Sequence, residues 1–254
     1  MDSRKSKLAI TKDENMLQAY QKYELLKNEV GHWQQERGSH WAKMLSLAEK
    51  PPYLPIMDLP SEAIIELWQR LNIAAKVEIT NSALKEMWEQ FKNGQNPMDV
   101  EMSTRMQMAI NGVAQLASKM AKEGVPDGHK VSDDLQSSTV CPVCGEQSAV
   151  AALTPPDGKR MMQCTLCGFE WPVKRVGCLF CGSEDAKQQI YLQNEAYPGV
   201  EMVVCEICGQ YFKEIDARKL AAKDYLWEDL KTLPLNFATK LWLKEQAQKN
   251  NQLH

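Results

Sequence analysis

All eight cysteines of this 254-residue chain fall in one segment, where they form four Cys-x-x-Cys pairs, each followed by glycine. The pairs are Cys141 and Cys144, Cys164 and Cys167, Cys178 and Cys181, and Cys205 and Cys208. No cysteine is left over, and none lies before residue 141 or after residue 208. Such regular pairing predicts sets of metal ligands, and this constrains the fold of the segment more than any other feature.

The spacing within each pair has a physical reason. Two intervening residues allow one tight turn, here called a knuckle, to direct both sulfurs at a single ion. The glycine that follows permits the positive φ that such a turn needs, and backbone amides of the turn can donate to the thiolates. Two knuckles supply four sulfurs, which suits tetrahedral zinc or a single iron ion. We therefore predict two mononuclear metal ions, each in a four-Cys site.

The segments between the pairs indicate which knuckles share an ion. The intervals are 19, 10 and 23 residues long. The first and third each contain two short apolar runs around a turn, 149–153 with 160–163 and 189–192 with 200–204, which is typical of a β-hairpin. Residues 169–175 and 210–215 are the expected closing strands. We assign one site to Cys141, Cys144, Cys164 and Cys167, and the other to Cys178, Cys181, Cys205 and Cys208. In the alternative, an interleaved cross-brace, the first pair joins the third and the second joins the fourth.

Other uses of paired cysteines fit the chain less well. Residues 1–10 are polar and basic and lack the apolar core of a secretory signal, and no stretch approaches the roughly 20 apolar residues of a membrane helix. We therefore expect a soluble, intracellular protein without membrane insertion. In a reducing compartment, paired cysteines are metal ligands or redox centres before they are structural disulfides. A thioredoxin-type redox pair is typical of a helix start beside a βαβ pattern, whereas these pairs flank hairpins.

Apolar residues at helical spacing predict a helical N-terminal domain over residues 1–124. A first helix over 13–48 is expected to break near Gly31 and Gly38. A second helix is expected to start near Ser61, with an apolar face of Ile64, Leu67, Trp68 and Leu71. A third is expected to stop at Asn93-Gly94, with a face of Leu84, Met87, Trp88 and Phe91. A fourth is expected after Asn96 as N-cap and Pro97 as first helical residue, with a face of Met102, Met106, Ala109, Val113, Leu116 and Met120. We interpret these faces as core. The alternative is a methionine-rich groove for a partner helix.

The remaining boundaries follow from changes in composition. A polar run predicts a linker over 125–139, followed by a first four-Cys module over 140–176 and a second over 177–216. C-terminal helices are expected over 217–254, with Asp216 as an N-cap and Pro234 separating two helical segments. The chain is therefore expected to be an α+β protein.

The sequence offers no catalytic constellation. A closed four-thiolate site has no open coordination position, which argues against metal-assisted hydrolysis. The histidines, His32, His40, His129 and His254, all lie outside the cysteine segment, and no phosphate loop or nucleophile elbow occurs. We therefore expect no enzymatic activity and no catalytic residues.

Charge argues against a nucleic-acid partner. Zinc ribbons that bind nucleic acid need a basic surface. Residues 137–216 carry 6 basic and 10 acidic side chains, a net charge of −4 before any thiolate is counted. A nucleic-acid-binding ribbon is thus the weakest of the functions considered.

The linker between the second and third knuckles is more specific than a generic zinc ribbon. Residues 164–181 read Cys-Thr-Leu-Cys-Gly-Phe-Glu-Trp-Pro-Val-Lys-Arg-Val-Gly-Cys-Leu-Phe-Cys, with Glu170, Trp171 and Arg175 between two knuckles. Together with Cys-x-x-Cys-Gly-x-Tyr-Phe-Lys at 205–213 and Asp-Leu-Lys-Thr-Leu-Pro-Leu at 229–235, this run resembles the formate dehydrogenase accessory protein FdhE family. The resemblance is best over 137–240 and weaker over the N-terminal helices.

This resemblance implies a helical N-terminal domain followed by two tandem rubredoxin-like/zinc-ribbon modules and C-terminal helices. It also implies a cytoplasmic accessory protein that binds the catalytic subunit of respiratory formate dehydrogenase and supports its assembly before export, with iron favoured over zinc. Trp171, Arg175 and Tyr211 are the candidate partner contacts, although the two aromatic residues could instead belong to the module cores. A rubredoxin-like electron-transfer protein is the alternative function.

Overall fold

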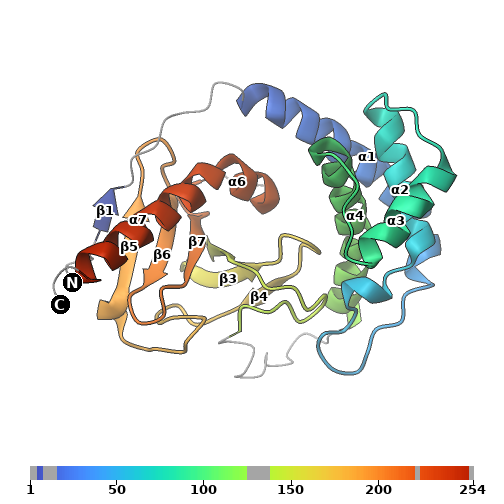
Figure 1. The fold of residues 1–254 in the computed structure, drawn as a ribbon. Coiled ribbons are helices and arrows are strands. Elements are labelled where there is room, and N and C mark those ends of the chain that lie inside the picture. Colours follow the sequence, from blue (N-terminus) through green and yellow to red (C-terminus); the bar gives the residue numbers. More distant parts are fainter. Residues whose placement is uncertain (1–4, 8–15, 125–137, 221–223, 252–254) are drawn as a thin grey trace.

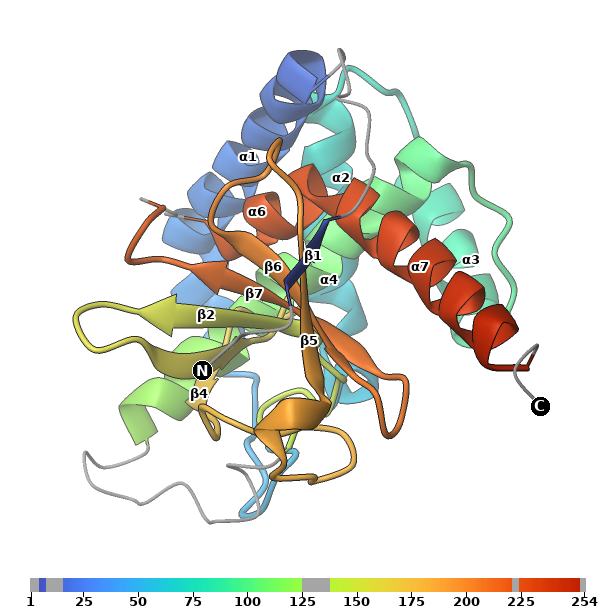
Figure 2. The ribbon, with the colours of Figure 1, turned by 90° about the vertical axis from the view of Figure 1, so that its left-hand side faces the viewer.

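The computed structural model describes residues 5–7, 16–124, 138–220 and 224–251. Helices α1–α4 gather on one side of the molecule and a seven-stranded sheet lies on the other, with α6 and α7 beside the sheet (Figures 1 and 2). The predicted fold class is confirmed: a helical N-terminal region, a cysteine-rich sheet and C-terminal helices. Of the predicted linker, only residues 138 and 139 are described, and His129 and His254 also lie outside the described residues.

The helical region has a core made from the predicted apolar faces. Its helices are α1 (Met16–Ala42), α2 (Ser61–Ala74), α3 (Asn81–Lys92) and α4 (Val100–Gly124). Trp68 of α2, Leu84 of α3 and Val113 of α4 have no exposed surface. Met106 is 3% exposed, while Met102 and Met120 pack against the same core. The methionine stripe of α4 is therefore core, and not a groove open to a partner helix.

Helix α1 runs unbroken through Gly31 and Gly38, so the predicted breaks are wrong. At Gly38 a Cβ atom would lie 3.2 Å from a methyl carbon of Leu116 on α4, so the glycine allows close approach of the two helices. On α4, a Cβ at Gly112 would lie 2.9 Å from Val30 of α1. This packing outweighs the helix-propensity cost of about 1 kcal/mol for each glycine.

The sequence predicts that the fourth helix begins at Pro97. Helix α4 instead begins at Val100. The side chain that caps it is Asp99, whose Oδ1 accepts from the Met102 N–H at 2.7 Å. Asn96 caps no helix, because its Oδ1 accepts from the Met98 N–H within the preceding turn. Asn96 and Asp99 are both residue types that favour the N-cap position, and the helix starts after Asp99.

The sheet is built from two like units of three strands. The first contains β2 (Val150–Thr154), β3 (Lys159–Gln163) and β4 (Glu170–Pro172), and the second contains β5 (Gln189–Gln193), β6 (Val200–Cys205) and β7 (Tyr211–Asp216). Each unit is antiparallel throughout, so both predicted hairpins form.

The two units join into one sheet, a feature that the sequence does not predict. The strand order is β1-β5-β6-β7-β2-β3-β4, and β7 pairs in parallel with β2, with Glu214 opposite Ala151. The parallel pairing gives corresponding strands of the two units the same direction. Since each unit has one knuckle before its first strand and one before its third, all four knuckles lie along the same end of the sheet.

A further strand covers the outer edge of the second unit. Strand β1 (Lys5–Lys7) pairs in parallel with β5, with Lys5 opposite Tyr191. The polar and basic composition of this segment does not suggest a strand, and only its pairing with β5 defines one.

The chain after β7 differs from the sequence prediction. Asp216 does not cap a helix: it ends β7, and its Oδ1 accepts from Arg218 Nε at 2.8 Å. Helix α6 (Tyr225–Lys231) begins later, at Asp224, whose Oδ1 accepts from the backbone N–H groups of the next turn. Both aspartates carry capping chemistry, but Asp216 is committed to the sheet.

Helix α7 (Leu233–Asn251) lies against the second unit of the sheet (Figure 2). Its Leu235 side chain has no exposed surface and packs with residues of β5, β6 and β7. Two C-terminal helical segments form as predicted, but they separate at Thr232 and not at Pro234. Pro234 lies in the first turn of α7, where its nitrogen needs no hydrogen-bond partner. Among the described helices, none combines the length and the apolar character that crossing a bilayer requires.

Candidate metal centres

The structure gathers the eight cysteines into two groups of four. The first group is Cys141, Cys144, Cys164 and Cys167, and the second is Cys178, Cys181, Cys205 and Cys208. Within each group all Sγ atoms lie within 4.8 Å of one another. This is the sequential grouping expected from the hairpins, and not the interleaved cross-brace.

The separations between sulfurs fit a tetrahedral ion. A tetrahedron with metal–sulfur bonds of about 2.3 Å has edges of about 3.8 Å. In the first group the Sγ atoms of Cys141 and Cys167 are 3.5 Å apart, as are those of Cys144 and Cys164. In the second group the corresponding separations are 3.7 Å and 3.9 Å. Each group could therefore hold one ion with all four thiols as ligands.

The knuckles have the backbone geometry that the glycines suggest. Gly145, Gly168, Gly182 and Gly209 have φ between +68° and +79°, and each donates its N–H to the carbonyl of the first cysteine of its pair. A side chain would be strained at this φ. Backbone amides also point at sulfur, as at Cys178, whose Sγ accepts from the Phe180 N–H at 3.4 Å. These donors favour thiolates over thiols.

The first group lies inside the core shared by helices and sheet. Its four cysteines are 0–5% exposed and belong to the same apolar cluster as Trp68 and Val113. The second knuckle of this group rests on α4, where Asn111 Nδ2 donates to the Thr165 carbonyl at 3.4 Å. An ion in this group would therefore sit at the junction between the two parts of the molecule.

Residues 48–54 take part in this junction, although the sequence marks them only as a proline-punctuated connection. The N–H of Tyr53 donates to the Pro142 carbonyl at 3.0 Å, and that of Leu54 donates to the Val143 carbonyl at 2.8 Å. These bonds join the connection to the first knuckle. Nothing local in the sequence indicates a partner about 90 residues away.

The second group is closer to solvent. Cys178 and Cys205 are 6% and 3% exposed, but Cys208 is partly exposed and Cys181 is exposed. Burial raises the pKa of the Cys178 thiol and raises that of Cys208 to about 12. Without a nearby cation, burial therefore favours the protonated form of these two thiols, and the positive charge of a metal ion would reverse that preference.

The three candidate partner contacts lie in different environments. Trp171 is 1% exposed and donates Nε1–H to the Ser138 carbonyl at 3.1 Å, so this aromatic residue is core and cannot reach a partner in this conformation. Arg175 is 47% exposed, and its Nη1 lies 3.8 Å from Glu214 Oε2. Tyr211 is partly exposed on β7. Only Arg175 and Tyr211 remain candidates for a contact.

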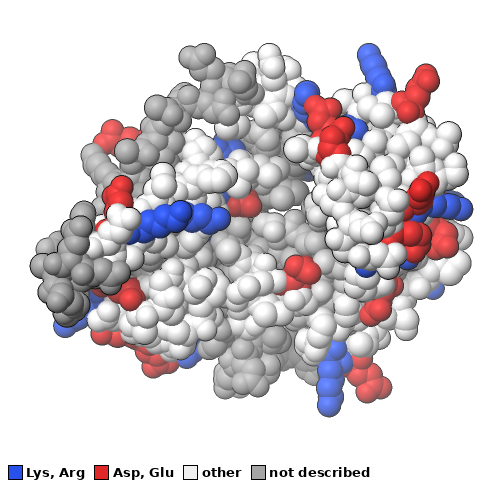
Figure 3. All heavy atoms as spheres, viewed as in Figure 1, with Lys and Arg blue, Asp and Glu red and all other residues white. Residues whose placement is uncertain are grey.

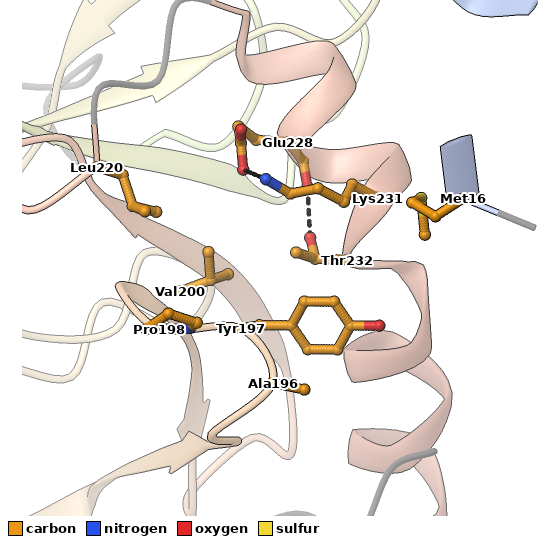
Figure 4. Close-up of a pocket in the computed structure, with 9 residues that line it drawn as sticks. All are labelled: Met16, Ala196, Tyr197, Pro198, Val200, Leu220, Glu228, Lys231 and Thr232. Atoms are coloured by element: carbon orange, nitrogen blue, oxygen red, sulfur yellow. Dashed lines mark hydrogen bonds and ion pairs between the residues drawn. The ribbon is translucent and has the colours of Figure 1, made fainter. Parts of the chain in front are cut away.

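One cavity of the described residues is lined by none of the cysteines. It has a volume of about 240 Å³ and lies between the β5–β6 turn and α6, and Figure 4 shows its lining residues. Tyr197 and Pro198 come from the turn, and Lys231 pairs with Glu228 at 2.6 Å on the helix. The charged groups that line this cavity thus satisfy each other, and they form no catalytic arrangement.

Acidic and basic side chains are interspersed on the face shown in Figure 3. On the described residues of this face, the blue side chains do not form a continuous track. That distribution gives no support to a nucleic-acid interface.

Comparison with known proteins relates the chain to one group. No family model matches it. An FdhE homologue of Aquifex aeolicus is 32% identical over 112 residues, 42% of this chain and 38% of that protein. The FdhE protein of Escherichia coli O127:H6 is 25% identical over 203 residues, 79% of this chain and 61% of that protein. The chain is similar in sequence to the FdhE proteins. The resemblance expected from the cysteine segment is thereby confirmed.

The similarity to the FdhE proteins covers only part of those proteins. An FdhE homologue of Edwardsiella ictaluri is 32% identical over 126 residues, 48% of this chain and 38% of that protein. The matched residues thus span less than two thirds of each of these relatives. Among solved structures, the FdhE protein of Pseudomonas aeruginosa matches 92% of this chain and 76% of its own, with 20% identity and a TM-score of 0.49.

Proposed function

We propose that the chain is an accessory protein that binds the catalytic subunit of respiratory formate dehydrogenase in the cytoplasm and supports its assembly before export. The observation that carries this proposal is the similarity to the FdhE proteins. The two four-thiol groups agree with it, since the FdhE resemblance implies a pair of rubredoxin-like modules. The chain has two like units joined into a single sheet, with one four-thiol group in each unit.

In this proposal the eight cysteines bind two ions and perform no catalysis. Each ion would have four protein ligands and no position for a substrate. The ion would neutralise thiolates and fix the knuckles, because a ribbon of this size gains much of its folding free energy from metal. Iron is favoured by the resemblance, and zinc fits the same donor set.

Association with the enzyme can be tested in cells that make formate dehydrogenase. The tagged full chain is isolated from such cells, and bound proteins are identified by mass spectrometry. We expect the catalytic subunit to be recovered with it, and more of it from cells in which export is blocked. Failure to recover any formate dehydrogenase subunit would contradict the proposal.

Variants of the exposed candidates refine this test. Arg175→Ala and Tyr211→Ala are expected to weaken recovery of the catalytic subunit. Lys85→Ala, at an exposed position on α3 in the helical region, is the matched control and should leave recovery unchanged. Equal recovery with all three variants would remove Arg175 and Tyr211 from the proposed contact.

Electron transfer is a second candidate function, and the exposure of Cys181 and Cys208 favours it. Electron transfer weakens steeply with distance, so a redox centre must lie close to the surface that a partner can reach. The second thiol group meets this condition, whereas the first is enclosed.

Metal analysis of protein purified without oxygen tests the electron-transfer function. Iron in the second group, with a red colour that disappears on reduction and returns on oxidation, would support electron transfer. A colourless protein with about two zinc ions per chain would eliminate it.

A further inference from the structure

The two thiol groups have the same ligands but differ in what covers them. In the first group no cysteine is more than 5% exposed. In the second, Cys181 is exposed and Cys208 is partly exposed. Because Cys144 and Cys181 are each the second cysteine of the first knuckle in their unit, the same position is enclosed in one unit and open in the other.

The cover over the first group comes from outside the sheet. Backbone bonds from Tyr53 and Leu54 hold the knuckle at 141–145, and a Cβ on Gly145 would lie only 3.3 Å from Pro52. The other knuckle is backed by α4 through the Asn111–Thr165 bond. Any ligand approaching this group from solvent would have to displace parts of the helical region.

The second group is covered less completely among the described residues. Leu179 in its first knuckle is buried in the same apolar cluster as the first thiol group, but its second knuckle is open to solvent. In its second knuckle, at 205–209, the side chains of Glu206 and Ile207 are exposed, with Ile207 at 58%, and so is Gly209. Its cysteines belong to neither apolar cluster found in the described part of the chain. An incoming ligand therefore meets the ion through the side occupied by Cys181 and Cys208.

We infer that the ion of the second group exchanges with external thiol or chelating ligands, whereas the ion of the first group is a fixed part of the junction between helices and sheet. Ligand exchange at a four-thiolate ion starts when an incoming donor reaches the metal and a thiolate leaves. The shell around a site controls that access. This inference depends on both groups binding an ion, and not on the role in formate dehydrogenase assembly.

The test uses the full wild-type chain loaded with two Zn²⁺ ions. The colorimetric chelator 4-(2-pyridylazo)resorcinol is added in excess, and release is followed by absorbance. We expect two phases of one ion each, with rates that differ by at least about tenfold, in line with the effect of outer-shell groups on metal sites. Release of both ions in a single phase would overturn the inference.

Alkylation identifies which ion leaves first. Iodoacetamide is added after the fast phase, and the modified peptides are identified by mass spectrometry. The expected products carry the label on Cys178, Cys181, Cys205 and Cys208, with Cys141, Cys144, Cys164 and Cys167 unmodified. Label on the first group would contradict the inference, even if release were biphasic.

A matched pair of variants gives an independent readout. Cys181→Ser is expected to abolish the fast phase and keep the slow one. Cys144→Ser is expected to remove the slow phase if the protein folds. Should it not fold, the wild-type labelling pattern decides alone. Wild-type protein that binds no Zn²⁺ would overturn the metal assignment as well, whereas two ions with equal rates would overturn this inference only.

Discussion

Arg160 Nε donates to Glu214 Oε2 at 2.7 Å, and this buried ion pair joins β3 of the first unit to β7 of the second. The two side chains are 0% and 4% exposed. The Arg160 guanidinium also lies 5.0 Å from the centre of the Phe212 ring and donates to the Lys174 carbonyl. The pair therefore links the two cysteine units behind their knuckles.

Glu214→Gln is expected to destabilise the protein strongly. The change keeps the volume of the side chain but leaves the buried Arg160 charge without its carboxylate. Breaking one side of a buried ion pair typically costs about 3–5 kcal/mol. Urea unfolding of the metal-loaded protein would measure the loss. An apolar pair, Arg160→Met with Glu214→Leu, should recover much of it, because neither buried charge then remains.

The control for this prediction is an ion pair at the surface. Glu184→Gln breaks the contact between Lys174 Nζ and Glu184, whose atoms are 2.8 Å apart and largely exposed. We expect no measurable change in the unfolding midpoint. A similar loss in Glu184→Gln and Glu214→Gln would show that burial of the Arg160 pair is not the cause.

Asp224 couples helix α6 to helix α1. One carboxylate oxygen caps α6, while the other accepts from the Tyr23 hydroxyl and from Lys27, each at 2.6 Å. These contacts hold the pKa of Asp224 below its usual range against the opposing effect of burial. Asp224→Ala should lower the free energy of unfolding by about 1–2 kcal/mol through loss of the cap alone. Tyr23→Phe keeps the cap and should cost less, and a larger loss for Tyr23→Phe would contradict this ranking.

Two helix glycines should respond to alanine in opposite directions. At Gly112 a Cβ atom would lie 2.5 Å from Leu67 and 2.9 Å from Val30, so Gly112→Ala is expected to destabilise by about 1–3 kcal/mol. At Gly31 no atom lies within 4 Å of the added Cβ, and Gly31→Ala should stabilise α1 by about 0.5–1 kcal/mol. Thermal unfolding of both variants checks the signs. Two stabilised variants would show that α1 and α4 can separate at little cost.

Cys164→Ser is expected to remove one ion and leave the second group loaded. Cys205→Ser, at the same place in the other unit, should also leave one ion. The Cys164 variant should lose more stability, because its ion lies in the core that helices and sheet share. Elemental analysis and urea unfolding would measure both effects. Loss of both ions from either variant would show that the continuous sheet couples the two sites.

Local patterns predict the parts of this fold that depend on neighbouring residues. The knuckles and both hairpins follow from spacing, because two cysteines and a glycine define a turn within five residues. The face of α2 is likewise predicted, since Ile64, Leu67 and Trp68 are close in sequence and share one side of the helix.

Contacts between distant residues are not predicted in this way. The sequences of β7 and β2 do not indicate that these strands pair in parallel. The sequence around Tyr53 likewise does not indicate its hydrogen bond to Pro142. Gly38 of α1 misleads for the same reason, because its value lies in the close approach of α4. The unequal exposure of the two thiol groups also depends on contacts between distant residues. The Cys-x-x-Cys-Gly motifs are alike, so they do not predict which group is exposed.

The parallel pairing of β7 with β2 places the two units head to tail, and such an arrangement has no inherent end point. A third unit could add in the same way at β5 or at β4. Strand β1 occupies the outer edge of β5 in the parallel sense that another β7 would take. At the other edge the Val173 N–H points inward to the Arg160 carbonyl, so the nitrogen of Pro172 faces outward and has no proton to donate. Strand β1 at one edge and Pro172 at the other therefore oppose the addition of further units to the sheet.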